Sequence, residues 1–249
     1  MAQYDIFFQN EHPKIAQRFL TWLNFSLFQF LKRKIVSKEA RKVRILEIGP
    51  GKGYFYQAIS KAKNVSYVAC DRNISFRQSF PEAEFYLATA PSFPENIGTF
   101  DMIYASYVVE HLSDGLAVAE LLRGCLKHLN PGGIVVITCP NALAQKFEFW
   151  NMDYTHRYPT TARNIHMAFL EAGFSNTEIY EISGLLTFPG FTFRPFQWCL
   201  KVVLFFYRYR VMHFFFGWIL KKKLYELNNS FYRLYCLVKQ ENLLCIGKK

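Results

Sequence analysis

A glycine-rich turn near residue 50 has the residue types that could hold a nucleotide-like cofactor. The run Ile45 to Phe55 reads ILEIGPGKGYF, in which Glu47 is followed by Gly49, Gly51 and Gly53. Glycines let the backbone approach a ligand closely, and a helix that begins after them offers unpaired N–H groups. Because several dinucleotide-binding folds use such a turn, it predicts only that an adenosine-containing cofactor binds.

Asp71 is the second candidate for cofactor binding. It ends the apolar run Val65 to Cys70, about 20 residues after the glycines, where a carboxylate can accept hydrogen bonds from both ribose hydroxyls. An aspartate here is also a common strand-end or capping residue, and it serves more than one class of cofactor. Asp71 therefore predicts ribose binding without naming the cofactor.

His111 and His156 are the candidate catalytic residues. Both follow expected strands, at the edge where open α/β sheets bind ligands. If a hydroxyl must lose its proton in the reaction, an imidazole with a pKa near neutrality is a suitable general base. Each histidine also has a structural interpretation: His111 in a loop that packs over the cofactor, and His156 beside a helix capped by Thr160, with Arg157 on the surface.

Short apolar runs and helical stretches alternate from residue 43 onward and would position these groups. Strands are expected at 43–48, 65–70, 84–87, 100–105, 133–139, 177–182 and 243–247. Helices are expected at 51–62, 116–129 and 160–172, with a turn at 130–133 and an irregular loop at 140–158. Alternating strands and helices form βαβ units, so the fold class is α/β with a doubly wound, parallel sheet.

The two ends of the chain differ from this middle part. Residues 1–44 carry nine Lys/Arg against three Asp/Glu, residues 45–193 ten against fourteen, and residues 194–249 eleven against two. We expect three parts: an N-terminal helical segment at 1–42, with a helix from about 13 to 36; a catalytic domain at 43–183 with 242–249; and a helical insertion at 184–241. The last 56 residues also contain clusters of aromatic residues beside Lys and Arg. Such clusters are typical of segments that lie at a membrane interface.

Several motifs in order resemble those of class I S-adenosylmethionine-dependent methyltransferases. They are the Glu47 to Gly53 turn, Asp71, the run Phe100 to Ile103 followed by Val109 to Leu112, and Leu129 to Gly133. The resemblance covers residues 45–139. It implies a Rossmann-like sheet, mostly parallel with an antiparallel last strand, and S-adenosylmethionine as the cofactor.

The resemblance also implies roles for the turn and for Asp71. Gly49, Gly51 and Gly53 would line the methionine part of the cofactor, Glu47 would orient the site and Asp71 would hold the ribose. Where many such enzymes have an acidic residue beside the adenine, this chain reads LATA over residues 87–90. Thr89 or backbone groups would then contact the adenine.

A shorter stretch, residues 153–174, resembles methyltransferases of bacterial surface-polysaccharide and lipid-linked sugar synthesis. Methyl transfer to oxygen of a glycan or lipid-linked acceptor, at an anionic membrane surface, is therefore the leading hypothesis. A quinone-like or other small apolar acceptor, and a non-catalytic binding subunit of the same fold, are the alternatives. A nucleic-acid substrate is disfavoured, because the chain has no recognisable RNA-binding module and no motif for a flipped base.

Cysteine spacing and hydropathy indicate in which compartment the protein is expected to work. The six cysteines are far apart, without a CxxC pair or a Cys/His cluster at zinc spacing, so neither a metal site nor a disulfide framework is predicted. The first 13 residues do not resemble a signal peptide, and no apolar run reaches the roughly 20 residues that span a bilayer. We expect a cytoplasmic protein, peripheral on the cytoplasmic face of the membrane.

Overall fold

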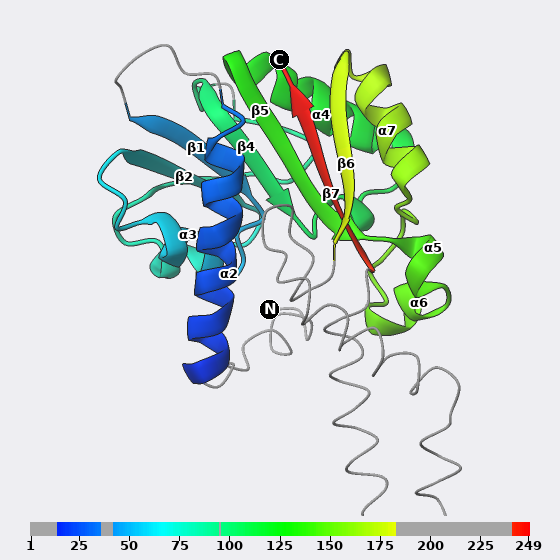
Figure 1. Cartoon of the computed structure of the whole chain (residues 1–249), viewed down its shortest axis with the longest axis horizontal. Coiled ribbons are helices and arrows are strands. Elements are labelled where there is room, and N and C mark those ends of the chain that lie inside the picture. Colours follow the sequence, from blue (N-terminus) through cyan, green and yellow to red (C-terminus); the bar gives the residue numbers. More distant parts are fainter. Residues whose placement is uncertain (1–13, 36–41, 95, 183–240) are drawn as a thin grey trace, which may run out of the picture.

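The computed structural model describes residues 14–35, 42–94, 96–182 and 241–249, and Figure 1 shows their arrangement. The strands in these ranges are β1 Val43–Ile48, β2 Val65–Asp71, β3 Glu84–Leu87, β4 Phe100–Ser106, β5 Leu129–Pro140, β6 Asn176–Ile182 and β7 Asn242–Lys248. The helices are α2 Lys14–Lys32, α3 Tyr54–Ile59, α4 Gly115–His128, α5 Ala142–Gln145, α6 Glu148–Met152 and α7 Ala162–Glu171, with 3-10 turns η1 Ile74–Ser79 and η2 Val109–His111.

The strands form one seven-stranded sheet in the order β3-β2-β1-β4-β5-β7-β6. The pairs among β1 to β5 are parallel, whereas β7 runs antiparallel to both β5 and β6. The expected fold class, a mostly parallel Rossmann-like sheet with an antiparallel last strand, is confirmed. Parallel strands end at a common edge, so β1, β2, β4 and β5 bring their C-terminal residues together there (Figure 1).

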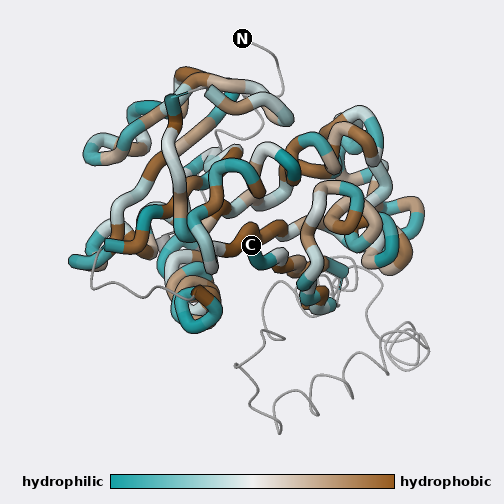
Figure 2. Tube along the Cα trace, turned by 90° about the horizontal axis from the view of Figure 1, so that it is seen from above, coloured by the Kyte–Doolittle hydropathy of each residue, from teal (hydrophilic) through white to brown (hydrophobic). Residues whose placement is uncertain are grey.

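Helices cover both faces of the sheet, which explains why the strands are apolar throughout. On one face α4 and α7 pack against alternate residues such as Ile103 and Ile137. On the other face α2 and α3 pack against the intervening residues, such as Met102 and Val136. Figure 2 shows apolar residues along the central strands and hydrophilic ones at many of the outer turns. A strand buried on both faces must be apolar at successive positions, as the sequence runs indicated.

The described helix α2 ends earlier than the expected helix at 13–36 and packs on the domain. Leu27, Phe28 and Leu31 are buried, and the Phe28 ring meets Phe55 of α3 edge-on at 6.4 Å. Beyond the helix, the Lys34 ammonium is 2.6 Å from the Glu178 carboxylate of β6. The C-terminal half of α2 is therefore part of the core, while Trp22 and other residues before it are partly exposed.

Truncating Phe28 tests how much this packing stabilises the domain. Phe28→Ala removes a 1% exposed ring and leaves a cavity between α2 and α3, so we expect the free energy of unfolding to fall by about 3–5 kcal/mol. Phe25→Ala is the matched control, because Phe25 lies on the same helix but is 42% exposed. Chemical denaturation measures both variants. Equal losses would contradict burial of this face of α2.

Three local expectations differ from the structure. The helix expected at 51–62 is limited to α3, because the left-handed Gly53 precedes it and Ser60 ends it. The expected irregular loop at 140–158 contains α5 and α6, where the Asn141 side chain accepts the Leu143 N–H at 3.2 Å and caps α5. The expected turn at 130–133 interrupts β5 as an irregularity, at which the pairing register with β4 shifts.

Residues 183–240, and with them most of the expected insertion at 184–241, lie outside the described ranges, as do residues 1–13. Because β6 and β7 are paired neighbours, the expected insertion connects two adjacent strands of the sheet. The division into three parts stays a prediction. In the part of the chain that the structure describes, no helix combines the length and the apolar character needed to cross a membrane.

Candidate functional site

The glycine turn after β1 leaves room beside its backbone at one point. Gly49, Gly51 and Gly53 all have positive φ, between 49° and 71°. A Cβ added at Gly49 would lie 2.7 Å from a methyl group of Val108, whereas one added at Gly51 would meet nothing within 4 Å. The Gly49 N–H donates to the Cys70 carbonyl at 2.8 Å, which ties the turn to the end of β2. The backbone at Gly51 therefore borders open space at the C-terminal edge of the sheet.

Two buried carboxylates lie on either side of this turn. Asp71 is 7% exposed and accepts the Asn73 N–H at 2.8 Å. Burial raises the pKa of Asp71, while the backbone N–H groups of Asn73 and Gly51 oppose this shift. Glu47 is 3% exposed, and its carboxylate accepts the hydroxyl of Tyr67. Burial is the main cause that raises the pKa of Glu47 to about 8, and the neighbouring Asp71 adds to the shift.

The shifted pKa of Glu47 predicts how stability depends on pH in the cofactor-free protein. Between the ordinary pKa of 4.5 and the folded value of about 8, the folded state binds the proton more tightly than the unfolded state. The contribution of Glu47 to stability is therefore largest below this window, and it falls by up to about 5 kcal/mol as the pH rises through it. Glu47→Gln should remove this loss and make the protein more stable than the wild type at pH 8.

Urea denaturation at several pH values between 4.5 and 8.5 measures this effect. Glu120→Gln, a change at an exposed carboxylate on α4, should keep the wild-type profile. If Glu47→Gln also keeps the wild-type profile, the carboxyl of Glu47 is ionised in the folded protein and the prediction is wrong.

Thr89 lies in the loop that follows β3. The preceding Ala88 N–H donates to the Asp71 carbonyl at 3.1 Å, so this loop is held at the same edge of the sheet as Asp71. Thr89 itself is exposed, and its carbonyl accepts the Ser92 N–H at 3.1 Å. Its side chain is thus accessible next to the ribose candidate, and the adenine contact stays a prediction.

The two candidate catalytic histidines come together after β4 and β5. Their ring centroids are 5.1 Å apart, although His111 belongs to η2 and His156 to the loop after α6. The carbonyl of Glu110 accepts the N–H groups of Arg157 and Tyr158, at 2.8 and 3.0 Å, which fastens the two segments to each other. The sequence placed both histidines at the same edge of the sheet, and the fold brings their rings close together there.

Hydrogen bonds define which nitrogen of each ring is free. The Thr155 hydroxyl donates to Asp153 at 2.7 Å, so it accepts from Nδ1 of His111, 2.8 Å away. Nδ1 of His156 is 2.5 Å from the Phe149 carbonyl, which can only accept. Both rings therefore carry a proton on Nδ1 when neutral, and Nε2 is left as a lone-pair donor. Burial lowers the pKa of His111, and the nearby Asp153 opposes this.

Glu110 is the unexpected member of this group. Its side chain is 0% exposed, and neither carboxylate oxygen has a hydrogen-bond partner among the residues that the structure describes. Burial raises the pKa of Glu110 to about 8, and the charge of Asp153 adds to the shift. One potential ligand atom from each of Glu110, His111 and His156 lies within 4.8 Å of the others. An unpartnered buried carboxylate is costly, so its place beside two imidazoles calls for a function.

The histidine pair and the glycine turn belong to one site. Val108, which touches the position of a Cβ on Gly49, lies in the same loop as His111. Arg72, which follows Asp71 directly, is close enough to lower the pKa of His111. The structure thus brings together the two ends of the predicted site, a cofactor end at β1 and β2 and a second end at β4 and β5.

A family model described as a methyltransferase domain matches residues 15–179, more than half of the chain. This chain belongs to the methyltransferase domain family. No curated protein matches it. S-adenosylmethionine is its methyl donor, as the ordered motifs indicated.

Solved methyltransferases share the fold at low sequence identity. A SAM-dependent methyltransferase from Archaeoglobus fulgidus is 16% identical, with a TM-score of 0.57 over 94% of this chain and 98% of that chain. One from Mesorhizobium loti is also 16% identical, with a TM-score of 0.56 over 89% and 97%. Phosphoethanolamine N-methyltransferase 2 of Haemonchus contortus, in complex with S-adenosyl-L-methionine, is 16% identical, with a TM-score of 0.59 over 100% of this chain and 60% of that chain.

The residues around the turn fit the methyl donor of this methyltransferase. The open side of Gly51 leaves space for a ligand to approach the backbone. The buried Asp71 carboxylate beside it can accept hydrogen bonds from hydroxyl groups. The Glu47 carboxylate accepts a hydrogen bond from the buried Tyr67 hydroxyl, which favours a role in shaping the site. We therefore expect Gly51 and Asp71 to contact the donor, and Gly49 and Gly53 to allow the turn.

Sequence reasoning about this methyltransferase missed Glu110, Asp153 and Thr155 as partners of the histidines. The adjacent letters Glu-His and the run Asp-Tyr-Thr-His were visible signals, because carboxylates and hydroxyls beside histidines are common polar networks. The alternative interpretation around His156 was partly wrong: Thr161 caps α7 by accepting the Asn164 N–H at 3.1 Å, while Thr160 donates to the Pro140 carbonyl. Arg157 is exposed, as that interpretation expected.

Proposed function

We propose that this methyltransferase transfers a methyl group to a hydroxyl of a glycan or lipid-linked acceptor at a membrane surface. The observation that carries the proposal is the juxtaposition of a polar cluster with an exposed apolar surface. The polar cluster consists of Glu110, His111, Thr155 and His156 at the edge of the sheet. The apolar surface lies on and around α5 and α6, directly before Thr155 and His156 in the chain.

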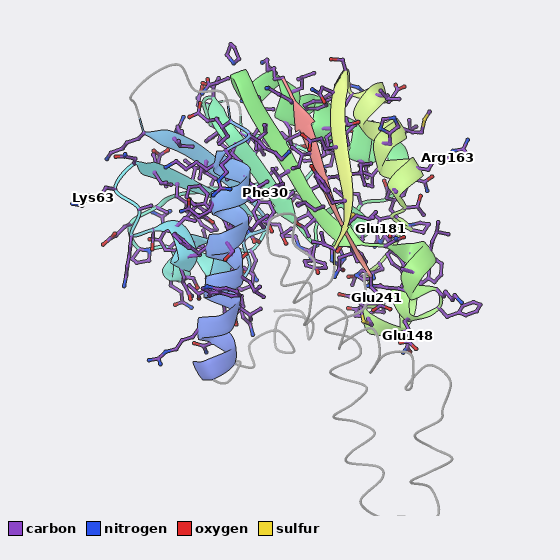
Figure 3. All side chains as sticks on the ribbon, in the orientation of Figure 1. Phe30, Lys63, Glu148, Arg163, Glu181 and Glu241 are labelled. Carbon is purple, nitrogen blue, oxygen red and sulfur yellow. The ribbon has the colours of Figure 1, made fainter. Side chains whose placement is uncertain are left out.

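The exposed surface, named here the α5–α6 patch, consists of Leu143, Phe147, Trp150, Met152 and Tyr154. These side chains are between 48% and 87% exposed. The cations Lys146 and Arg157 are exposed beside them. Figure 3 labels Glu148 of α6 and Glu241 in the lower right part of its view. The Glu241 carbonyl accepts the Asn141 N–H at 2.6 Å before α5. Large apolar side chains interleaved with cations are typical of a surface that enters a lipid interface.

The polar cluster supports a hydroxyl as the methyl acceptor. When bound, S-adenosylmethionine would supply a methyl group on a positively charged sulfur, from which an acceptor oxygen could displace it. The protein must align the acceptor and lower the pKa of its hydroxyl. His111 and His156 each keep Nε2 as a lone-pair atom for this purpose, because Thr155 and the Phe149 carbonyl hold the rings through Nδ1.

Vesicle binding combined with an activity assay tests the proposal. The protein should pellet with vesicles of phosphatidylglycerol at low salt and much less with phosphatidylcholine, because each Lys or Arg near an anionic surface contributes roughly 1 kcal/mol. Replacing Phe147 and Trp150 together by serine should weaken this binding. Met167→Ser is the matched control, since Met167 is 56% exposed on α7, away from the α5–α6 patch.

The acceptor is tested with labelled S-adenosylmethionine and a bacterial lipid extract. We expect label in a lipid-linked fraction, in a product that survives mild base, as an ether does and an ester does not. Label confined to amines or to nucleic acid would show that the proposed acceptor is wrong. Equal binding of the protein and its double serine variant to anionic vesicles would remove the α5–α6 patch from the proposal.

A further inference from the structure

We propose that Glu110, His111 and His156 form a binding site for one divalent transition-metal ion of the zinc type. The site goes beyond the proposed function, and its existence does not depend on the acceptor. Only the role given to the ion below rests on the proposed function.

The spacing of the three side chains is close to that of a metal site. One potential ligand atom from each residue lies within 4.8 Å of the others. Ligand atoms about 2.1 Å from a tetrahedral ion are roughly 3.4 Å apart, so side-chain rotations that move an atom by about 1 Å close the site. The residues come from η2 and the loop after α6, which the Glu110 carbonyl already joins.

Glu110 provides the strongest argument, because its carboxyl group is enclosed without a polar partner among the described residues. The carboxylate is 0% exposed, and both of its oxygens are without hydrogen-bond partners within the described residues. Burying a carboxylate in this way is unfavourable, and buried charges in proteins are normally paired or bound to a metal. A cation between Glu110 and the two histidines would supply the missing partner.

The histidines have the outer contacts that metal ligands usually have. A metal-bound imidazole commonly donates its other N–H to a carboxylate, a backbone carbonyl or water. His156 does so to the Phe149 carbonyl, and His111 reaches the Asp153 carboxylate through the Thr155 hydroxyl. In both rings Nε2 is left for the ion. These contacts orient the rings whether or not the ion is bound.

The donor set indicates the class of ion. Two imidazole nitrogens and one carboxylate suit Zn²⁺ and its neighbours Co²⁺ and Fe²⁺, whereas Mg²⁺ and Ca²⁺ prefer oxygen ligands throughout. Three protein ligands leave at least one coordination position open. If the acceptor hydroxyl occupies that position, the ion lowers its pKa, and the two histidines act as ligands rather than as bases.

Metal titrations without acceptor test the site directly. The full chain, first treated with a chelator, should bind one equivalent of Zn²⁺ by calorimetry and one of Co²⁺ by visible absorption. Glu110→Gln and His156→Ala should each abolish this stoichiometric binding. Thr155→Val, which removes only the outer contact of His111, should weaken it about 10- to 100-fold. His166→Ala is the control, because His166 lies apart from the three proposed ligands. Its Nδ1 is 2.9 Å from the Thr177 hydroxyl.

The wild-type result alone can overturn the proposal. If the folded wild-type chain binds no stoichiometric Zn²⁺ or Co²⁺, or if Glu110→Gln and His156→Ala bind as tightly as wild type, the site does not exist. Calorimetry with S-adenosylmethionine, which should be unchanged in all variants, shows that each variant is folded. Because no acceptor is present, failure of the metal site and failure of the proposed acceptor give different results.

Discussion

Replacing Asp71 by alanine is expected to weaken S-adenosylmethionine binding by roughly 10- to 150-fold. Hydrogen bonds to a charged group contribute about 1.5–3 kcal/mol, which corresponds to this range of affinities. Asp71 is buried at the end of β2, next to the glycine turn. Isothermal calorimetry of the cofactor-free protein measures the change.

Two further variants give this result its meaning. Asp71→Asn keeps an oxygen that can accept the Asn73 N–H, so it should lose less affinity than Asp71→Ala. Asp114→Ala removes the exposed carboxylate that caps α4, so it should lower stability and leave cofactor affinity unchanged. An affinity of Asp71→Ala within twofold of wild type would show that the ribose is held elsewhere.

Replacing His111 by alanine should reduce turnover on a hydroxyl acceptor by about 10²- to 10⁴-fold, the usual range for losing a group that assists proton removal. The hydroxyl must lose its proton as the methyl group is transferred, and Nε2 of His111 assists this loss either as a base or as a ligand of the ion proposed above. Cofactor affinity should be unchanged, because His111 follows β4, whereas we expect the donor to bind along β1 and β2. Steady-state kinetics with separate cofactor calorimetry measures both quantities.

The control for this variant is His166→Ala, whose ring lies on α7 and contacts Thr177. It should keep wild-type turnover. If His111→Ala retains turnover within about threefold, or if it loses cofactor affinity in proportion, His111 shapes the loop over the cofactor. The structural interpretation from the sequence would then be the correct one.

The sequence predicted the succession of strands and helices along the chain with small errors. The runs at 43–48 and 84–87 coincide with β1 and β3, and the expected fifth strand lies within β5. Strands buried on both faces need continuous apolar residues, so this part of the fold is written locally. The short helices α5 and α6 were missed because neither has a repeating apolar face, and their placement depends on contacts such as that of Asn141 with Glu241.

The sequence by itself determined the cofactor class and predicted the edge of the sheet at which the reaction takes place. The glycine turn, Asp71 and the ordered motifs are local patterns, because a tight turn and a strand end need particular residues at fixed spacing. The separation of His111 from His156 along the chain left their proximity to the fold. Only the tertiary structure decided that these rings meet, that the α5–α6 patch is exposed, and that Glu110 is enclosed beside the rings with no hydrogen-bond partner in the described ranges. Burial and contact between distant segments depend on how β4 and β5 pair and which loops follow them, and no local pattern encodes that.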